Sequence, residues 1–110
     1  MSDQLGLVFG ALADPTRRRM LDTLMREGST SVPALTAELP ITRQAVAKHL
    51  SALAGAGLVE RETSSGREVY YRLTPGALEP AASWMRTADA AWAGRLDRLK
   101  SSLEAGSSAS

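Results

Sequence analysis

The chain has 110 residues, with 13 lysines and arginines against 12 acidic residues, a single histidine and no cysteine. This length supports one domain with a modest core, which excludes a large multidomain enzyme. Without cysteine the chain has no disulfides, thiol nucleophiles or zinc fingers, and one histidine provides no imidazole cluster for a metal ion. We therefore expect no cofactor, no metal site and no enzymatic activity.

The sequence contains no run close to the roughly 18 to 20 apolar residues of a membrane span. Its N-terminus lacks the basic and apolar pattern of a secretory signal. We expect no membrane partner and a cytoplasmic location. The last six residues, 105–110, are alanine, glycine and serine only, which predicts a disordered tail after a single domain over 1–104.

Helical spacing of apolar residues predicts a first helix over 5–13. Asp14 is suited to cap a second helix, with Pro15 in its first turn and Gly28 at its end. The arginines at 17–19 crowd the first turn of this helix, where the helix dipole disfavours cations. They serve either in ion pairs with nearby acids or in a contact with phosphate or another subunit.

The next segment predicts two short helices joined by a tight turn. Ser31 caps the first, which has to stop before Pro40 because the residue preceding a proline avoids the helical region. Thr42 caps the second, which runs from Arg43 to about Ala54 and ends at the following glycines. The side chains expected to be buried on this helix are Val46, Leu50 and Leu53.

The period then changes from that of a helix to that of a strand. Residues 58–63 and 68–73 alternate as two strands, and 64–67 has the composition of a hairpin turn. The last element, 76–104, carries a long apolar seam at helical spacing. The predicted fold is mainly α with a small β-hairpin: a winged helix-turn-helix flanked by N- and C-terminal dimerisation helices, 5–13 and 76–104.

The helix after the tight turn carries the expected chemistry. No acidic residue occurs between Leu39 and Gly57, and a helix face that meets phosphates avoids carboxylates. Arginine and lysine recognise guanine or phosphate, and glutamine pairs with adenine. We therefore expect this helix to enter the major groove of double-stranded DNA. The expected DNA-binding residues of the helix are Thr42, Arg43, Gln44, Ala47, Lys48, His49 and Ser51.

Two of the expected DNA contacts have alternatives. His49 stands at the edge of the buried stripe, so it either packs or caps within the protein or contacts DNA, and a metal role has no second ligand. The hairpin tip, with Ser65, Gly66 and Arg67, is the acid-free part of the hairpin and is expected along the DNA backbone or in the minor groove. The alternative is a plain surface hairpin.

The terminal helices hold more large apolar side chains than a core of this size covers. A two-fold homodimer would bury them and would present two copies of the DNA-recognition helix. The alternative is a docking surface for another protein. The residues expected in the interface are Leu5, Val8, Phe9, Trp84, Trp92, Leu96, Leu99 and Leu103.

Several segments together resemble the ArsR (SmtB/ArsR) family of small dimeric bacterial repressors: 9–21, 41–50, 56–59, Gly66-Arg67 and Tyr70-Tyr71. The resemblance covers roughly residues 5 to 104, with the motifs in the family's order. It implies a homodimer on a pseudo-palindromic operator, with the fourth helix in the major groove. The predicted function is a sequence-specific, homodimeric and autoregulating repressor. The alternative is a winged-helix module for protein–protein contact without DNA binding.

One departure from the family pattern bears on the regulatory signal. Metal-sensing members of the family use cysteines near the third helix, or histidine and carboxylate pairs on the C-terminal helix. Here 32–36 contains no cysteine and the last helix contains no histidine. The chain therefore resembles a branch of the family that does not sense metal, with a small organic molecule, another protein or nothing as its effector.

Overall fold

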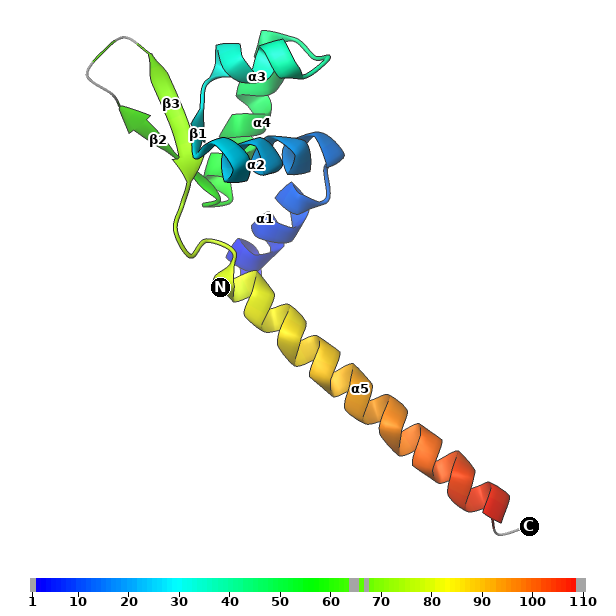
Figure 1. The fold of residues 1–110 in the computed structure, drawn as a ribbon. Coiled ribbons are helices and arrows are strands. Elements are labelled where there is room, and N and C mark those ends of the chain that lie inside the picture. Colours follow the sequence, from blue (N-terminus) through cyan, green and yellow to red (C-terminus); the bar gives the residue numbers. More distant parts are fainter. Residues whose placement is uncertain (1, 64–65, 67, 109–110) are drawn as a thin grey trace. The chain divides into compact units, whose positions relative to one another are not determined.

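The computed structural model describes residues 2–63, 66 and 68–108 (Figure 1). The chain divides into two compact units, Met1–Leu78 and Glu79–Ser110. The single domain over 1–104 that the sequence predicted stays a prediction. Each unit is described below by itself.

The first unit has the element order α1, α2, β1, α3, α4, β2, β3. This unit is mostly helical and contains a small antiparallel sheet, which confirms the predicted fold class. Its helices are α1 Ser2–Leu12, α2 Pro15–Glu27, α3 Val32–Glu38 and α4 Arg43–Gly55. Its strands are β1 Ser29–Thr30, β2 Val59–Thr63 and β3 Val69–Leu73.

Side-chain caps fix where three of these helices begin. Asp14, Ser31 and Thr42 each accept a hydrogen bond from the backbone N–H three residues further on, at 2.9, 3.2 and 3.1 Å. Each cap satisfies one of the N–H groups that a helix start leaves without a partner. Helix α2 ends at Gly28 with φ 87°, and α3 stops ahead of Pro40, so these predicted boundaries are confirmed.

The core of the first unit forms around the inner face of α4, which packs against α1, α2, α3 and β2. The three apolar side chains predicted for that face are fully buried, as are large side chains of α2 and α3. The fully buried residues at this centre are Val46, Leu50 and Leu53 from α4, Met20 and Leu24 from α2, and Leu35 from α3.

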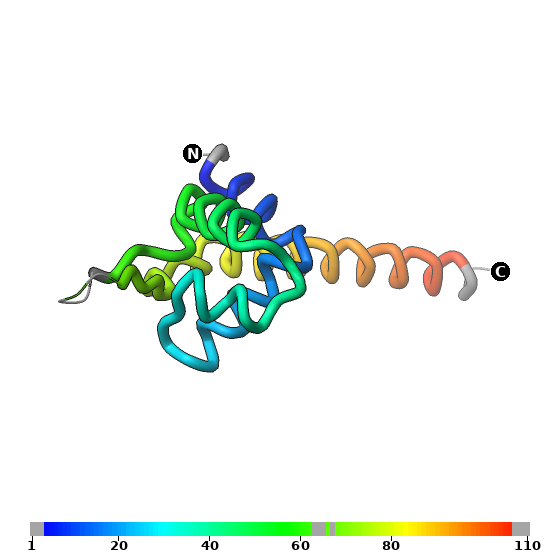
Figure 2. The backbone as a smooth tube through the Cα atoms, turned by 90° about the horizontal axis from the view of Figure 1, so that it is seen from above, coloured from blue at the N-terminus to red at the C-terminus, as the bar shows by residue number. Residues whose placement is uncertain are grey.

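The sheet has the order β1-β3-β2, with both pairs antiparallel. Figure 2 shows the hairpin of β2 and β3 projecting from the helices of this unit. Strand β1 was not predicted, because two residues are too few to show an alternating pattern. Its Ser29 and Thr30 pair with Arg72 and Tyr71 of β3 and so attach the hairpin to the end of α2.

The second unit is the 30-residue helix α5, Glu79–Ser108. The sequence predicted a helix over 76–104 and a disordered tail over 105–110, so both boundaries are corrected. The helix starts later because Gly76, with φ 72°, lies in a turn. It continues to Ser108 because alanine favours a helix and a last turn tolerates glycine and serine. Among the described residues no helix is long and apolar enough to cross a bilayer.

The C-terminal end of α4 yields a stability prediction. Gly57 has φ 77°, and a Cβ atom there would lie 3.1 Å from Nε2 of Gln4, which donates to the carbonyl of Ala56 at 2.6 Å. We expect Gly57→Ala to lower the free energy of unfolding by roughly 1–2 kcal/mol, measured by urea denaturation. The control is Gly55→Ala at the last residue of α4, where a Cβ would meet no other described part of the chain within 4 Å beyond its own neighbours and helix backbone, and this variant should leave the free energy of unfolding unchanged or raise it by up to roughly 1 kcal/mol. Equal effects of both variants would contradict this account.

The cap of α2 predicts a pH dependence. The backbone N–H of Arg17 donates to Asp14, lowering the pKa of this carboxyl below its ordinary value, and the charge of the Arg17 guanidinium lowers it further. A lowered pKa in the folded state means that the carboxylate stabilises the fold above its ordinary pKa and loses this contribution as the pH falls through the lowered value. Wild type should therefore exceed Asp14→Asn in free energy of unfolding most above the ordinary pKa of aspartate, about 3.9, and the difference should shrink as the pH falls below it.

Denaturation at a series of pH values checks this expectation. The matched control is Asp22→Asn, since Asp22 is exposed on the same helix and makes no hydrogen bond with any described residue. This variant removes one aspartate charge from α2 without touching the cap, so a pH dependence that appears in both variants would not belong to the cap. A difference between wild type and Asp14→Asn that widens on acidification would contradict the assignment.

Candidate nucleic-acid interface

Helix α4 presents two faces of opposite character. Val46, Leu50 and Leu53 are completely buried. Because their spacing fixes the rotation of the helix, the residues about half a turn away face outward. The predicted DNA-binding side chains that are exposed on or beside this outward face are Thr42, Arg43, Gln44, Ala47, Lys48 and Ser51.

The outward face of α4 is basic and carries no negative charge. Arg43 and Lys48 form no ion pair with any residue that the structure describes, so their charges are available to a partner. The nearest acids in sequence are Glu38 and Glu60, on α3 and β2. Each of those acids is engaged by an arginine, Glu38 with Arg26 at 3.1 Å and Glu60 with Arg72 at 2.7 Å.

His49 lies on the flank of α4 rather than on its outward face. Its side chain is 23% exposed. Nε of Arg17 donates to Nδ1 of His49 at 3.3 Å, and Oδ2 of Asp14 lies 4.0 Å from the same nitrogen. The structure thus places this histidine in a contact between α4 and α2, which was one of the roles that the sequence left open.

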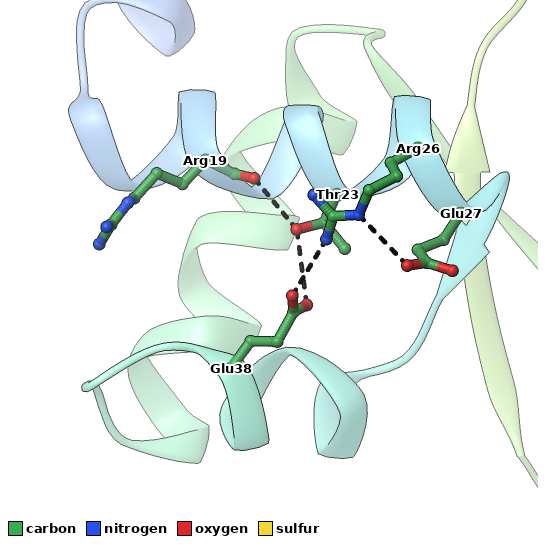
Figure 3. Close-up of polar contacts among 5 residues, drawn as sticks. All are labelled: Arg19, Thr23, Arg26, Glu27 and Glu38. Atoms are coloured by element: carbon green, nitrogen blue, oxygen red, sulfur yellow. Dashed lines mark hydrogen bonds and ion pairs between the residues drawn. The ribbon is translucent and has the colours of Figure 1, made fainter.

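Among the described residues, the arginines at the start of α2 form no direct ion pair with an acid, which was one of the two roles that the sequence left open. Arg17 binds His49, and Nη1 of Arg18 donates to the carbonyl of Leu12 at 2.6 Å, which caps the end of α1. Arg19 is exposed, its side chain has no partner among the described residues, and it points away from its neighbours in Figure 3. Of the three, Arg19 alone keeps a guanidinium free for another molecule.

A second group of polar contacts joins α2 to α3 (Figure 3). The buried hydroxyl of Thr23 lies 3.2 Å from the carbonyl of Arg19 and 3.5 Å from Oε2 of Glu38. Arg26 reaches the other oxygen of Glu38 at 3.1 Å and also contacts Glu27. Glu38 is the last residue of α3, so this group holds the helix next to the turn that leads into α4. Sequence reasoning did not predict this group, because charged residues on helix surfaces are common.

In the hairpin, two acids, Glu60 and Glu68, are engaged by neighbouring side chains. Glu60 binds Arg72 across the strands. The hydroxyl of Tyr70 donates to Glu68, and this bond to a carboxylate raises the pKa of Tyr70 above its ordinary value. At the tip, Gly66 is exposed. The other two predicted tip residues, Ser65 and Arg67, lie outside the described residues.

Helix α5 carries the predicted apolar seam as an exposed surface. Trp84, Trp92, Leu99 and Leu103 are 54%, 60%, 56% and 66% exposed, with Leu96 between them at 46%. These are large values for apolar side chains at helical spacing, and contiguous surfaces of this kind mark contacts with other molecules.

The predicted interface residues of α1 are less accessible. Leu5 and Phe9 are half-buried, whereas Val8 is only 4% exposed. Val8 therefore offers almost no surface to a partner, and its predicted place in a dimer interface differs from what the structure shows. No group of three or more histidine, cysteine or acidic residues arranged for a metal ion occurs in the part of the chain that the structure describes.

Comparison with known proteins agrees with this architecture. A helix-turn-helix domain family matches residues 12–62. The chain is 41% identical over 69 residues to the arsenic resistance transcriptional regulator ArsR1 of Pseudomonas putida, and the match covers 63% of this chain and 53% of that protein. The chain thus spans about half the length of this relative.

Solved structures extend the similarity over nearly the whole chain. An ArsR-like transcriptional regulator from Rhodococcus sp. RHA1 has a TM-score of 0.83 and 40% identity, over 94% of this chain and 93% of that one. A homodimeric winged helix-turn-helix DNA-binding domain from Mycobacterium bovis has a TM-score of 0.64 and 31% identity, over 79% and 80% of the two chains. The chain therefore belongs to the ArsR family of winged helix-turn-helix transcriptional regulators.

Proposed function

We propose that this protein is a homodimeric repressor that binds a pseudo-palindromic operator in double-stranded DNA and regulates its own gene. The observation that carries the proposal is the outward face of α4, which exposes Arg43, Gln44 and Lys48 and is free of acids from Leu39 to Gly57. A helix with this face suits the major groove, where phosphates attract cations and base edges accept hydrogen bonds. As a bacterial regulator acting on chromosomal DNA, it would work in the cytoplasm.

The residues of this face divide by chemistry. Arg43 and Lys48 suit guanine edges or phosphates, and Gln44 suits the paired donor and acceptor of adenine. Ala47 and Ser51 are small, which lets the helix backbone approach the bases. Thr42, which caps the helix, is also exposed and keeps its hydroxyl proton for a phosphate oxygen. From the hairpin we assign Ser65, Gly66 and Arg67 to the DNA backbone or minor groove.

The exposed seam of α5 supports the dimer. Trp92, Leu96, Leu99 and Leu103 would be covered by the same surface of a second copy, together with Leu5 and Phe9 of α1. A two-fold arrangement gives two copies of α4, which matches an operator with two related half-sites. The homodimeric neighbour from Mycobacterium bovis supports the same assembly.

The donor set of this chain does not fit a thiolate metal site. Arsenic and other soft metal ions prefer sulfur ligands, and the chain has no cysteine. Its one histidine, His49, already accepts a hydrogen bond from Arg17 at Nδ1. We propose that the effector, if the repressor has one, is a small organic molecule or a protein, unlike what the name of the arsenic resistance regulator ArsR1 indicates for that relative.

A module that contacts proteins without binding DNA is not favoured. Such a module has no requirement for an acid-free basic helix, because a solvated helix face ordinarily mixes charges of both signs. The two functions differ in one observable: only the DNA-binding protein loses affinity for a duplex when the outward face of α4 is altered.

The DNA interface predicts the effect of two substitutions. Gln44→Ala and Lys48→Ala should each weaken binding to the DNA upstream of the protein's own gene by about 1–3 kcal/mol, because each removes a bond to a base edge. Fluorescence anisotropy with that duplex at several salt concentrations measures the loss. The control is Arg86→Ala on α5, which also removes one positive charge but lies outside the interface and should bind as wild type does. Wild-type binding with no preference over a scrambled duplex would contradict the proposal.

The dimer interface predicts a second pair of variants. Leu99→Glu would bury an unpaired carboxylate in the seam, at a cost of about 3–5 kcal/mol, and should convert the homodimer into a monomer at micromolar concentration. Analytical ultracentrifugation reports the mass. Ser101→Glu is the control, because its position on α5 is about half a helical turn away from the seam, so the dimer should persist. A monomeric wild type, or a dimer that Leu99→Glu leaves intact, would contradict the proposed assembly.

A further inference from the structure

Helix α4 is held from its flank by a side-chain hydrogen bond between residues 32 positions apart in sequence. Nε of Arg17, on α2, donates to Nδ1 of His49, on α4, at 3.3 Å. A guanidinium has only donors, so Nδ1 of His49 is the acceptor in this contact. The contact thereby fixes the orientation of the ring as well as its position.

Asp14 completes this group. Its Oδ2 accepts from the backbone N–H of Arg17 at 2.9 Å, which fixes the first turn of α2, and lies 4.0 Å from Nδ1 of His49. The carboxylate thus places a negative charge beside the Arg17 guanidinium and the His49 ring. Asp14 and His49 are partly shielded, at 31% and 23% exposure, so water weakens the contacts of this group less than it weakens those of fully solvated side chains.

The geometry of this group separates His49 from the base-reading residues of α4. Gln44, Ala47, Lys48 and Ser51 are exposed on the outward face, whereas His49 is turned toward α2. The buried side chains of α4 fix how deep the helix lies in the core. They also set the rotation of the helix about its own axis, and a directional hydrogen bond at its edge narrows the range of rotation that apolar packing leaves.

We propose that His49 and Arg17 are positioning residues for DNA recognition: their hydrogen bond narrows the rotation of α4 that core packing leaves and thereby holds the direction of the base-reading side chains. The proposal rests on the DNA-binding function above and deepens it, because it assigns to Arg17 and His49 a role in specificity without DNA contact. Errors of about 1 Å in the placement of a functional side chain are sufficient to weaken a directional contact. Loss of the link therefore lowers operator affinity and leaves the general attraction to phosphates unchanged.

The link itself is tested in the free protein, independently of DNA. The 15N spectrum of the imidazole at neutral pH should show His49 with an unprotonated, hydrogen-bonded Nδ1 and a proton on Nε2. Arg17→Ala should shift the Nδ1 signal. Arg19→Ala, which removes an exposed arginine two residues along the same helix, should leave it in place. The opposite tautomer, or an Nδ1 signal that ignores Arg17→Ala, would overturn the proposal.

The effect on recognition is tested with two duplexes, the DNA upstream of the protein's own gene and a scrambled duplex of equal length. His49→Ala should lose about tenfold or more in affinity for the first and change by less than about twofold for the second. His49→Asn should restore most of the loss, because its Oδ1 occupies about the position of Nδ1 and accepts the same hydrogen bond. Thermal unfolding midpoints confirm that each variant is folded.

The salt dependence separates positioning from a phosphate contact. A phosphate contact by Arg17 would lower the slope of log affinity against log salt by about 0.9 in Arg17→Ala, whereas a positioning role leaves the slope unchanged. The double variant Arg17→Ala/His49→Ala should lose no more affinity than the single variant that binds more weakly, because both substitutions break the same hydrogen bond. A reduced slope, additive losses, equal losses on both duplexes or no rescue by asparagine would each overturn the proposal.

The two experiments distinguish the failure of this inference from the failure of the proposed function. If the free protein shows the hydrogen-bonded Nδ1 but wild type does not prefer the upstream duplex, then the DNA-binding function fails and the positioning role fails with it. If wild type binds that duplex specifically and His49→Ala binds it equally well, the function stands and the positioning role alone is wrong.

Discussion

Burial of one stripe of α4 is the constraint on which the rest of the first unit depends. Val46, Leu50 and Leu53 are fully buried, and each contributes about 1.5–3 kcal/mol of burial free energy. Since these side chains have to face the core, the residues on the other side have to face solvent. The same constraint that makes the core therefore exposes Gln44 and Lys48. Folding and recognition use opposite faces of one helix.

The polar contacts around α4 add directional restraints on the position of this helix to those that burial supplies. On the flank of α4, Arg17 donates to His49. At the C-terminal end of α4, Gln4 of α1 donates to the carbonyl of Ala56. Both bonds come from the helices before the tight turn. Helices α1 and α2 thus act as a frame for α4, and Glu38 ties α3 to the same frame through Arg26. The frame links the surface that we assign to dimerisation on α1 with the helix that we assign to DNA.

The sequence predicted the parts of the fold that depend on local chemistry. The caps at Asp14, Ser31 and Thr42 and the buried stripe of α4 follow from residue types at fixed spacing, and the structure confirms them. The contacts between segments that are distant in the sequence could not be predicted from local residue patterns. Strand β1 is too short for a pattern, and nothing local says that Arg17 meets a histidine 32 positions away.

DNase footprinting of the purified protein on the DNA upstream of its own gene tests the central claim most directly. A dimer that presents two copies of α4 predicts two protected half-sites related by a dyad, with centres about 10 base pairs apart or at a multiple of that spacing. The protection should disappear with Lys48→Ala at the same protein concentration. Uniform partial protection along the fragment, or none at concentrations where the protein is dimeric, would contradict the assignment of α4 as the sequence-reading helix.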